Sequence, residues 1–243
     1  MSSETSSNLG AESLFGLCNA QLTILGGVVE LAGQLQDENE ILVAQNQILQ
    51  DLATKDSKTG VLNARGLQEQ FSIMQGQAER GQHDQATEPS DKHNIIVMFD
   101  IDNFKQLNSS LGHQGADDKI KSLAETISQN IARRPDDIFG RHGGDEFVAI
   151  LSSINEQVCH NILEKISQKV KQEVGLTLSV GFAVIDKADD FKQAISKADI
   201  AAYRAKALGK DCIVAFSEIT EQEVYQRISN ILKDRLALLT NEC

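Results

Sequence analysis

The sequence predicts an α/β domain that is preceded by a long helical segment. After about residue 54, short apolar runs alternate with longer stretches of helical periodicity, which is typical of a sheet covered by helices. Before that point the chain contains no proline and repeats apolar residues at heptad spacing, which favours a coiled coil. We therefore divide the chain into an N-terminal helical segment (1–53), a globular domain (54–216) and a C-terminal amphipathic helix (217–243).

The N-terminal segment carries two heptad rows. The first row holds Leu14, Gln21, Val28, Leu35, Leu42 and Leu49, and the second holds Cys18, Leu25, Ala32, Asn39, Asn46 and Ala53. Leucine in one row with asparagine at two positions of the other favours a parallel two-stranded coiled coil, at some cost in stability. The coiled coil predicts a homodimer. The alternative is a single helix that folds back on its own domain.

The first half of the globular domain contains a helix, a loop, a strand and two further helices. Residues 76–94 have almost no apolar side chains and include one of the two prolines, so we expect a solvated loop. Residues 95–101 (IIVMFDI) form a nearly continuous apolar run, which predicts a strand covered on both faces. Helical stretches follow at 104–111 and 115–132.

The second half of the domain begins with a predicted β-hairpin. Residues 137–142 and 147–151 flank a Gly-Gly-Asp-Glu turn, whose glycines would supply the positive φ angles of a tight connection. A helix (155–173), a strand (176–185) and a second helix (189–207) follow. The stretch 218–239 is amphipathic, and we expect its apolar side to pack. That side holds Tyr225, Ile228, Ile231, Leu232, Leu236 and Leu239.

Composition excludes several classes of protein. The chain has 243 residues, of which 41% are hydrophobic, enough for one good core and a smaller extension. The formal net charge of -12 argues against a partner that is a nucleic-acid polymer. No apolar run reaches the length of a membrane span. The four cysteines lie far apart without a CxxC pair, which favours a reducing compartment, so we expect a cytoplasmic protein.

Four acidic residues lie at the end of a predicted strand and at the tip of a predicted hairpin. Asp100 and Asp102 close the apolar strand, and Asp145 and Glu146 stand at the tip of a hairpin that would lie beside it. Oxygen ligands of this kind hold Mg²⁺, and metals bridged by carboxylates serve phosphoryl transfer. Any one of these acids, taken alone, is more simply a solvated surface group. Together they predict a metal-dependent nucleotide site.

Residues 141–147 read RHGGDEF, and the chain resembles the GGDEF family of diguanylate cyclases. Three other regions match family motifs in the expected order. They are DSKTGVLNARG (56–66), FDIDNFKQLNSSLGHQGAD (99–117) and the pair SVGFA (179–183) with ADIAAYRAKALGKD (198–211). The resemblance covers about residues 54 to 216. It implies a palm-like domain with a central, mainly antiparallel sheet flanked by helices, which joins two GTP into cyclic di-GMP on a homodimer.

The resemblance also implies residue roles. Asp100 and Asp145 would bind Mg²⁺, or Mn²⁺, with help from the carbonyl of Ile101. The catalytic turn would consist of Gly143, Gly144, Asp145 and Glu146, with one of the two acids helping to deprotonate the ribose 3′-hydroxyl. The substrate site would include Phe104, Lys105, Asn108, Asp117, Lys206 and Lys210. In it, Asn108 and Asp117 would accept from the guanine edge, and the three lysines would contact phosphates. Considered alone, each of these lysines would more often be a solvated surface residue than a phosphate ligand.

A possible inhibitory site precedes the signature. Arg134 and Asp137 fit the family's R-x-x-D motif, which implies that the product cyclic di-GMP binds there and restrains the enzyme. A motif with only two fixed residues is weak evidence, because an arginine and an aspartate in a solvated turn would match it as well.

Six positions depart from the family pattern. They are Lys58 for leucine, Ala64 for arginine, Ser109 for aspartate, Ala116 for glycine, Lys210 for arginine and Asp211 for asparagine. None is a proposed metal ligand, so these changes bear on rate and affinity first. They keep open a second hypothesis, a receptor that binds GTP or cyclic di-GMP without turnover to control a partner. A third hypothesis is a coiled-coil scaffold whose globular part is structural.

Overall fold

The computed structural model describes residues 4–81, 91–131 and 134–240. Two compact units make up the chain, Met1–Asp51 and Leu52–Cys243. Helix α1 (Glu4–Thr54) is continuous, as its proline-free sequence predicts. The heptad positions from Leu14 to Leu25, together with Val28, have side chains outside the described part.

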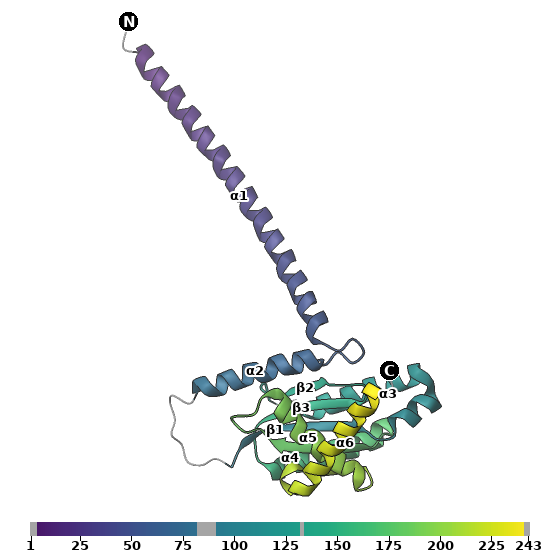
Figure 1. Ribbon diagram of the computed structural model, residues 1–243. Coiled ribbons are helices and arrows are strands. Elements are labelled where there is room, and N and C mark those ends of the chain that lie inside the picture. The colour runs from purple at the N-terminus through teal and green to yellow at the C-terminus, as the bar shows by residue number, and fades with distance from the viewer. Residues whose placement is uncertain (1–3, 82–90, 132–133, 241–243) are drawn as a thin grey trace. The chain divides into compact units, whose positions relative to one another are not determined.

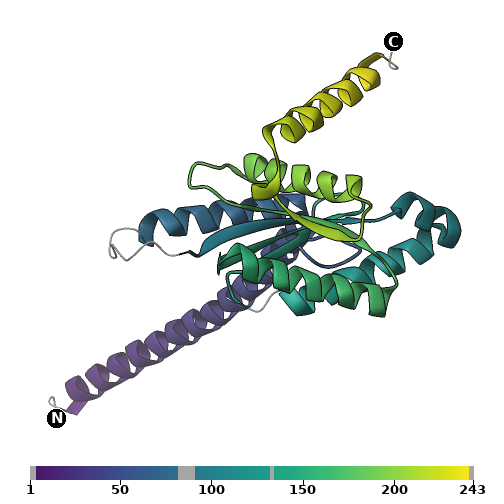
Figure 2. The same cartoon turned by 90° about the horizontal axis from the view of Figure 1, so that it is seen from below.

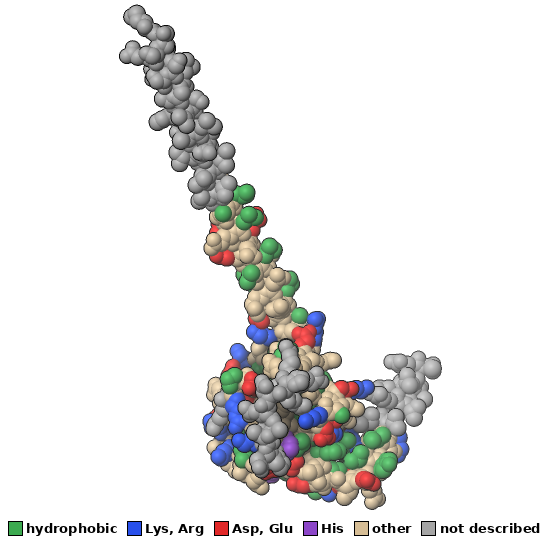
Figure 3. Space-filling model, turned by 90° about the vertical axis from the view of Figure 1, so that its left-hand side faces the viewer, with side chains coloured by type: hydrophobic (Ala, Val, Ile, Leu, Met, Phe, Trp, Pro, Cys, Tyr) green, Lys and Arg blue, Asp and Glu red, His purple; other side chains and the backbone are tan. Residues whose placement is uncertain are grey.

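The described part of α1 carries exposed apolar side chains. Leu35, Leu42 and Leu49 of the first heptad row are 58%, 56% and 62% exposed. Figure 3 shows hydrophobic side chains along this part of the helix. The helix is therefore confirmed, while its pairing with a second copy stays a prediction. Among the helices whose residues are described, none combines the length and apolarity needed to cross a membrane.

The second unit is built on a five-stranded sheet with the order β2-β3-β1-β4-β5. The strands are β1 (His93–Ile101), β2 (Ile138–Arg141), β3 (Glu146–Ile154), β4 (Leu178–Val184) and β5 (Cys212–Ala215). All neighbours pair antiparallel except β4 and β5, which are parallel. The mainly antiparallel sheet is thus confirmed. Strand β5 was not predicted from the sequence.

Helices cover both faces of this sheet (Figures 1 and 2). Ile95, Val97 and Phe99 of β1 point into a core shared with α3 (Phe104–Ile131) and α4 (Glu156–Lys169). Ile96 and Met98 point the other way, toward α2 (Ala64–Gly81) and α5 (Phe191–Ala207). The central strand is consequently buried on both sides, which explains its unbroken apolar run.

Three predicted boundaries differ from the structure. Helix α2 runs to Gly81, so the first residues of the expected loop 76–94 are helical; residues 82–90 lie outside the described part. The helix expected at 155–173 ends in a π-helical turn, Val170–Val174. The two helices expected at 104–111 and 115–132 meet at a kink, because Gly112 has φ 67° and ψ 175° inside α3.

The C-terminal helix α6 (Glu221–Thr240) follows a short 3-10 turn, Phe216–Glu218. Its contacts with α5 are largely polar. Arg227 binds Asp199 at 2.9 Å and lies 4.3 Å from the ring centroid of Tyr203. Tyr225 and Ile228 are 73% and 45% exposed, so the expected packing is wrong for the two stripe residues whose side chains are described. The other four lie outside the described side chains.

Candidate active site

The predicted carboxylates meet at one end of the sheet. Asp100 on β1 lies opposite Glu146 on β3 in the antiparallel register. The next residue of β1, Ile101, donates its backbone N–H to the carbonyl of Asp145 at 3.2 Å. Strand pairing therefore brings together the two segments that the sequence places far apart.

Burial gives these acids unusual electrostatics. The Asp100 side chain is 7% exposed, and burial raises its pKa to about 6, helped by the charges of Asp145 and Glu146 and opposed by Lys206. Burial also raises the pKa of Glu146, and the charges of Asp199 and Asp145 add to the effect. Crowded, poorly solvated carboxylates favour a divalent cation, because it lowers their mutual repulsion.

The protein itself supplies few ligands for such a cation. Within the described residues, no three His, Cys, Asp or Glu side chains are grouped in a way that could hold a metal ion. Mg²⁺ typically binds through one or two carboxylates together with water and substrate phosphates. Asp100 and Asp145, with the carbonyl of Ile101, fit that mode.

Of the three expected lysines, Lys206 contacts one of the acids directly. Lys206 on α5 donates to Asp100 Oδ2 at 2.5 Å, and Lys210 donates to Asn103 Oδ1 at 2.6 Å. Lys105 lies exposed in the first turn of α3. All three have ammonium groups on partly or fully exposed side chains, so an anionic ligand has access to positive charge here despite the acidic chain.

The two expected guanine readers lie on either side of the kink in α3. Asn108 is half-buried before Gly112, and Asp117 follows it. Both carboxylate oxygens of Asp117 accept from Lys58 Nζ, at 2.7 and 2.8 Å. The structure thus shows a partner for Asp117 that the sequence did not predict. Phe104 is half-buried and packs against the core.

The signature turn is wider than the expected tight connection. The backbone N–H groups of His142 and Gly143 both donate to the carbonyl of Glu146. Neither Gly143 nor Gly144 is among the described residues with positive φ, so that expectation is wrong. A side chain at Gly143 would instead come within 2.8 Å of Glu146 Oε2, whereas one at Gly144 would meet nothing within 4 Å. A side chain at Gly143 would therefore require the carboxylate of Glu146 to shift.

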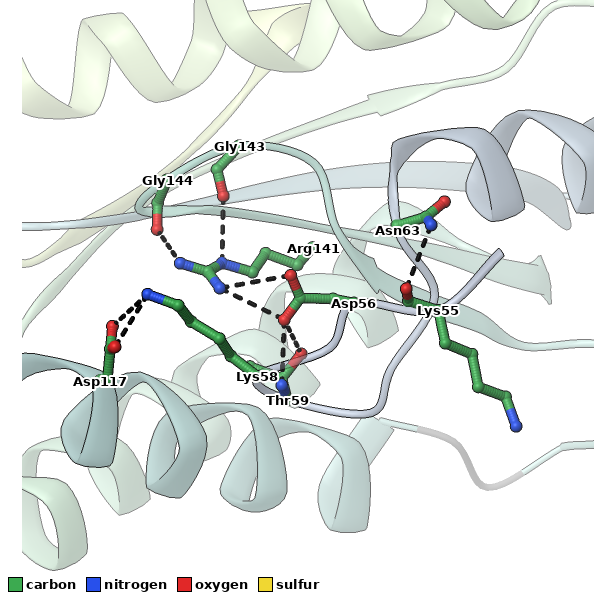
Figure 4. A network of polar contacts seen from close by, with 9 residues as sticks. All are labelled: Lys55, Asp56, Lys58, Thr59, Asn63, Asp117, Arg141, Gly143 and Gly144. Atoms are coloured by element: carbon green, nitrogen blue, oxygen red, sulfur yellow. Dashed lines mark hydrogen bonds and ion pairs between the residues drawn. The ribbon is translucent and has the colours of Figure 1, made fainter. Parts of the chain in front are cut away.

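Arg141 holds this turn, a role that sequence reasoning missed. Its guanidinium donates to the carbonyls of Gly143 at 3.1 Å and Gly144 at 2.6 Å (Figure 4). It also binds Asp56 at 3.2 Å, and its side chain is only 9% exposed. The sequence offered one signal for this contact. Arg141 stands just before the signature, and Asp56 opens the first family motif.

Asp102, the other acid at the end of β1, is engaged in local structure. Asp102 is buried and accepts from Ser179 Oγ at 2.6 Å and from the backbone N–H of Asp211 at 3.0 Å. It therefore joins β1 to β4 and to the loop before β5.

The predicted inhibitory residues also make local contacts. Asp137 accepts from the backbone N–H groups of Arg134 and Ser152, at 3.2 and 3.1 Å. The guanidinium of Arg134 donates to the carbonyls of Ser152 and Ser153. Asp137 is half-buried and Arg134 is exposed. Arg134 and Asp137 thus lie together at the turn before β2, beside the end of β3.

Comparison with known proteins identifies similar chains. A family model described as "Diguanylate cyclase, GGDEF domain" matches residues 53–212. Diguanylate cyclase DosC of Escherichia coli strain K12 is 29% identical over 125 residues, which cover 48% of this chain and 27% of DosC. The probable diguanylate cyclase DgcC of the same strain is 29% identical over 178 residues, 70% of this chain and 45% of DgcC. The chain therefore spans less than half the length of these two relatives.

A solved structure resembles the chain over most of its length. It is the crystal structure of the coiled coil and GGDEF domain of DgcB from Caulobacter crescentus in complex with c-di-GMP. The TM-score is 0.66 at 26% sequence identity, and the match covers 76% of this chain and 98% of that chain. In that relative a coiled coil accompanies a GGDEF domain.

Proposed function

The chain belongs to the GGDEF family of diguanylate cyclases, and from this premise we propose that it joins two GTP into cyclic di-GMP, using Mg²⁺ on a homodimer. The observation that carries the proposal is the gathering of Asp100, Asp145 and Glu146 at the paired ends of β1 and β3, with Lys206 beside them. Negative oxygens for a metal and a cation for phosphate are the two requirements of phosphoryl transfer.

Each site residue has a part in this scheme. Asp100, Asp145 and the carbonyl of Ile101 would hold the metal, which, when bound, would offset the phosphate charge. Lys206 is expected to release Asp100 and turn to the phosphates, and Lys105 and Lys210 would assist it. Mn²⁺ would be an alternative ion. Asn108 and Asp117 would accept from the guanine edge.

The chemical step transfers a nucleotidyl group. The 3′-oxygen of one GTP forms a bond to the α-phosphorus of the other, the bond from that phosphorus to the β-phosphate oxygen breaks, and pyrophosphate leaves. The same step in the opposite direction closes the ring. One of the two acids of the turn, Asp145 or Glu146, would accept the proton of the 3′-hydroxyl.

Dimerisation follows from this chemistry, because a chain that holds one GTP needs a second chain to present the other. The exposed leucine row of α1 offers a surface for a parallel coiled coil. Arg134 and Asp137 would bind the product as an inhibitor once their local contacts exchange. We expect this system in the cytoplasm.

A second candidate is a receptor that binds nucleotide without turnover. One contact favours it: Lys206 occupies Asp100, an expected metal ligand. This contact would have to break before a metal binds for catalysis. The receptor predicts nucleotide binding without release of pyrophosphate.

The test is turnover of GTP by the purified full chain with Mg²⁺, with cyclic di-GMP and pyrophosphate measured by chromatography. Asp145→Asn should lower the rate at least about 100-fold, because loss of transition-state charge stabilisation costs several kcal/mol. Asp118→Asn, an exposed carboxylate on α3, is the matched control and should stay within about twofold of wild type. EDTA should abolish product.

Two other results would replace the cyclase proposal. A chain that forms no product while GTP and Mg²⁺ raise its melting temperature would be the receptor. A chain whose melting temperature does not respond to GTP would favour a purely structural role.

A further inference from the structure

Lys58 and Asp117 form an ion pair that joins the loop between α1 and α2 to α3 (Figure 4). The ammonium group lies 2.7 Å from one carboxylate oxygen and 2.8 Å from the other. The two side chains are 50% and 38% exposed, so a ligand can reach both. Exposed ion pairs add little to stability, which leaves this one without a strong structural purpose.

The backbone that carries Lys58 is held firmly. Asp56 accepts from the backbone N–H and the hydroxyl of Thr59, at 3.0 and 2.7 Å, and its carbonyl accepts from Gly60 at 2.8 Å. Arg141, which binds the carbonyls of the signature turn, also binds Asp56. The loop that carries Lys58 is therefore linked to the same arginine that holds the signature turn.

The pair retains hydrogen-bonding capacity. An ammonium group has three N–H donors and a carboxylate has about four lone-pair sites. The ion pair uses two donors and one site on each oxygen. One donor of Lys58 and at least one acceptor site of Asp117 thus remain, next to each other. Guanine presents the complementary pattern, an O6 acceptor beside an N1–H donor.

We propose that Lys58 determines base specificity, by donating to guanine O6 while Asp117 accepts from guanine N1–H. This inference rests on the proposed function, which puts the guanine edge at Asp117. In the same position adenine would turn its 6-amino donor toward the ammonium group and its N1 acceptor toward the carboxylate, so both contacts would be mismatched. The leucine that is usual here in the family has no donor.

The test measures binding of two diphosphates with Mg²⁺ by calorimetry. GDP cannot release pyrophosphate, and 6-thio-GDP keeps N1–H but replaces O6 with sulfur, a weak acceptor. Lys58→Met keeps most of the stem and loses the donor. It should weaken GDP binding about tenfold, the loss expected for a partly exposed charge-assisted hydrogen bond. It should change the affinity for 6-thio-GDP less than about twofold.

Controls separate the base contact from general charge and from folding. Lys121→Met removes an exposed lysine from α3, the helix that carries Asp117, and it should change both affinities less than about twofold. Lys58→Leu provides a second variant, and thermal melting verifies that each variant is folded.

Three results overturn the inference. If folded Lys58→Met and Lys58→Leu bind GDP as tightly as wild type, or more tightly, Lys58 does not read O6 and merely competes for Asp117, while the proposed function stands. If both diphosphates weaken equally, Lys58 acts through charge alone. A wild-type chain that binds no GDP overturns the proposed function and this inference together.

Discussion

At the scale of single residues, Asp100 is one of two acids, with Asp102, that are almost fully buried in the described part of the chain. It ends the central strand, its side chain is almost fully buried, and its partner is a lysine from another element. Burial without a metal leaves this carboxylate poorly stabilised, since one ion pair does not replace the lost hydration. Its protonation should therefore be visible in the stability of the metal-free protein.

Asp100→Asn should change how stability depends on pH. The pKa of Asp100 rises from 3.8 in the unfolded chain to about 6 in the folded one. The contribution of this group is therefore fully present below about pH 4 and is lost as the pH rises through about 6. Over that interval, wild type should lose up to about 3 kcal/mol relative to the variant. Urea unfolding in EDTA across this range measures the difference, and a pH-independent difference would refute the assignment.

At the scale of elements, α5 lies unusually close to β4. A side chain at Gly181 would come within 2.1 Å of the backbone nitrogen of Ala202 and 2.3 Å of the carbonyl of Ala198. The buried residues of α5 are mostly alanine, which permits this approach. Because α5 also carries Lys206, the close packing helps to set the position of that cation beside Asp100.

Gly181→Ala should therefore be strongly destabilising. The clash is with backbone atoms, which cannot move aside as a flexible side chain can, so we expect a loss of more than about 3 kcal/mol. Gly144→Ala, where nothing lies within 4 Å, should cost less than about 1 kcal/mol. Urea denaturation compares the two. Similar losses for both variants would mean that α5 moves away from the sheet without difficulty.

The sequence predicts elements best where a pattern is long and local. The apolar run of β1 and the proline-free stretch of α1 are of this kind, and both elements are confirmed. Strand β5 has only 4 residues, and its parallel pairing with β4 depends on the intervening helix. Four residues are too few to show a pattern from which pairing with a strand distant in the sequence could be predicted.

Side-chain partners in the site were harder to predict than the residues themselves. Motifs pointed to Asp117 and Lys206, and the structure places them at the expected segments. Which lysine contacts which acid depends on three-dimensional distance, so the pairs of Lys58 with Asp117 and of Lys206 with Asp100 appeared only in the fold. The role of Arg141 was missed for the same reason.

At the scale of the whole molecule, activity should depend on pairing of α1. Leu42→Ala with Leu49→Ala removes two exposed leucines of one heptad row from each chain. Each leucine buried in a dimer contributes roughly 1.5–3 kcal/mol, so the dimer dissociation constant should rise more than about 100-fold. Sedimentation measures it, and turnover at low protein concentration should fall in parallel.

The matched control for this prediction is Val43→Ala, which removes an equally exposed apolar side chain outside both heptad rows. It should leave the dimer dissociation constant within about fivefold of wild type. An effect as large as that of the double variant, or a wild-type chain that sediments as a monomer, would contradict the coiled coil.

The end of α1 is also linked to the signature turn. Asn63 donates to the carbonyls of Ala53 and Lys55, and within the same loop Asp56 binds Arg141, which in turn holds the glycine carbonyls of the signature. The helix end, the loop and the signature turn are thus joined by consecutive hydrogen bonds that run through Arg141, the last residue of β2. Loss of any one of these bonds would interrupt the connection between the last turn of α1 and the signature turn.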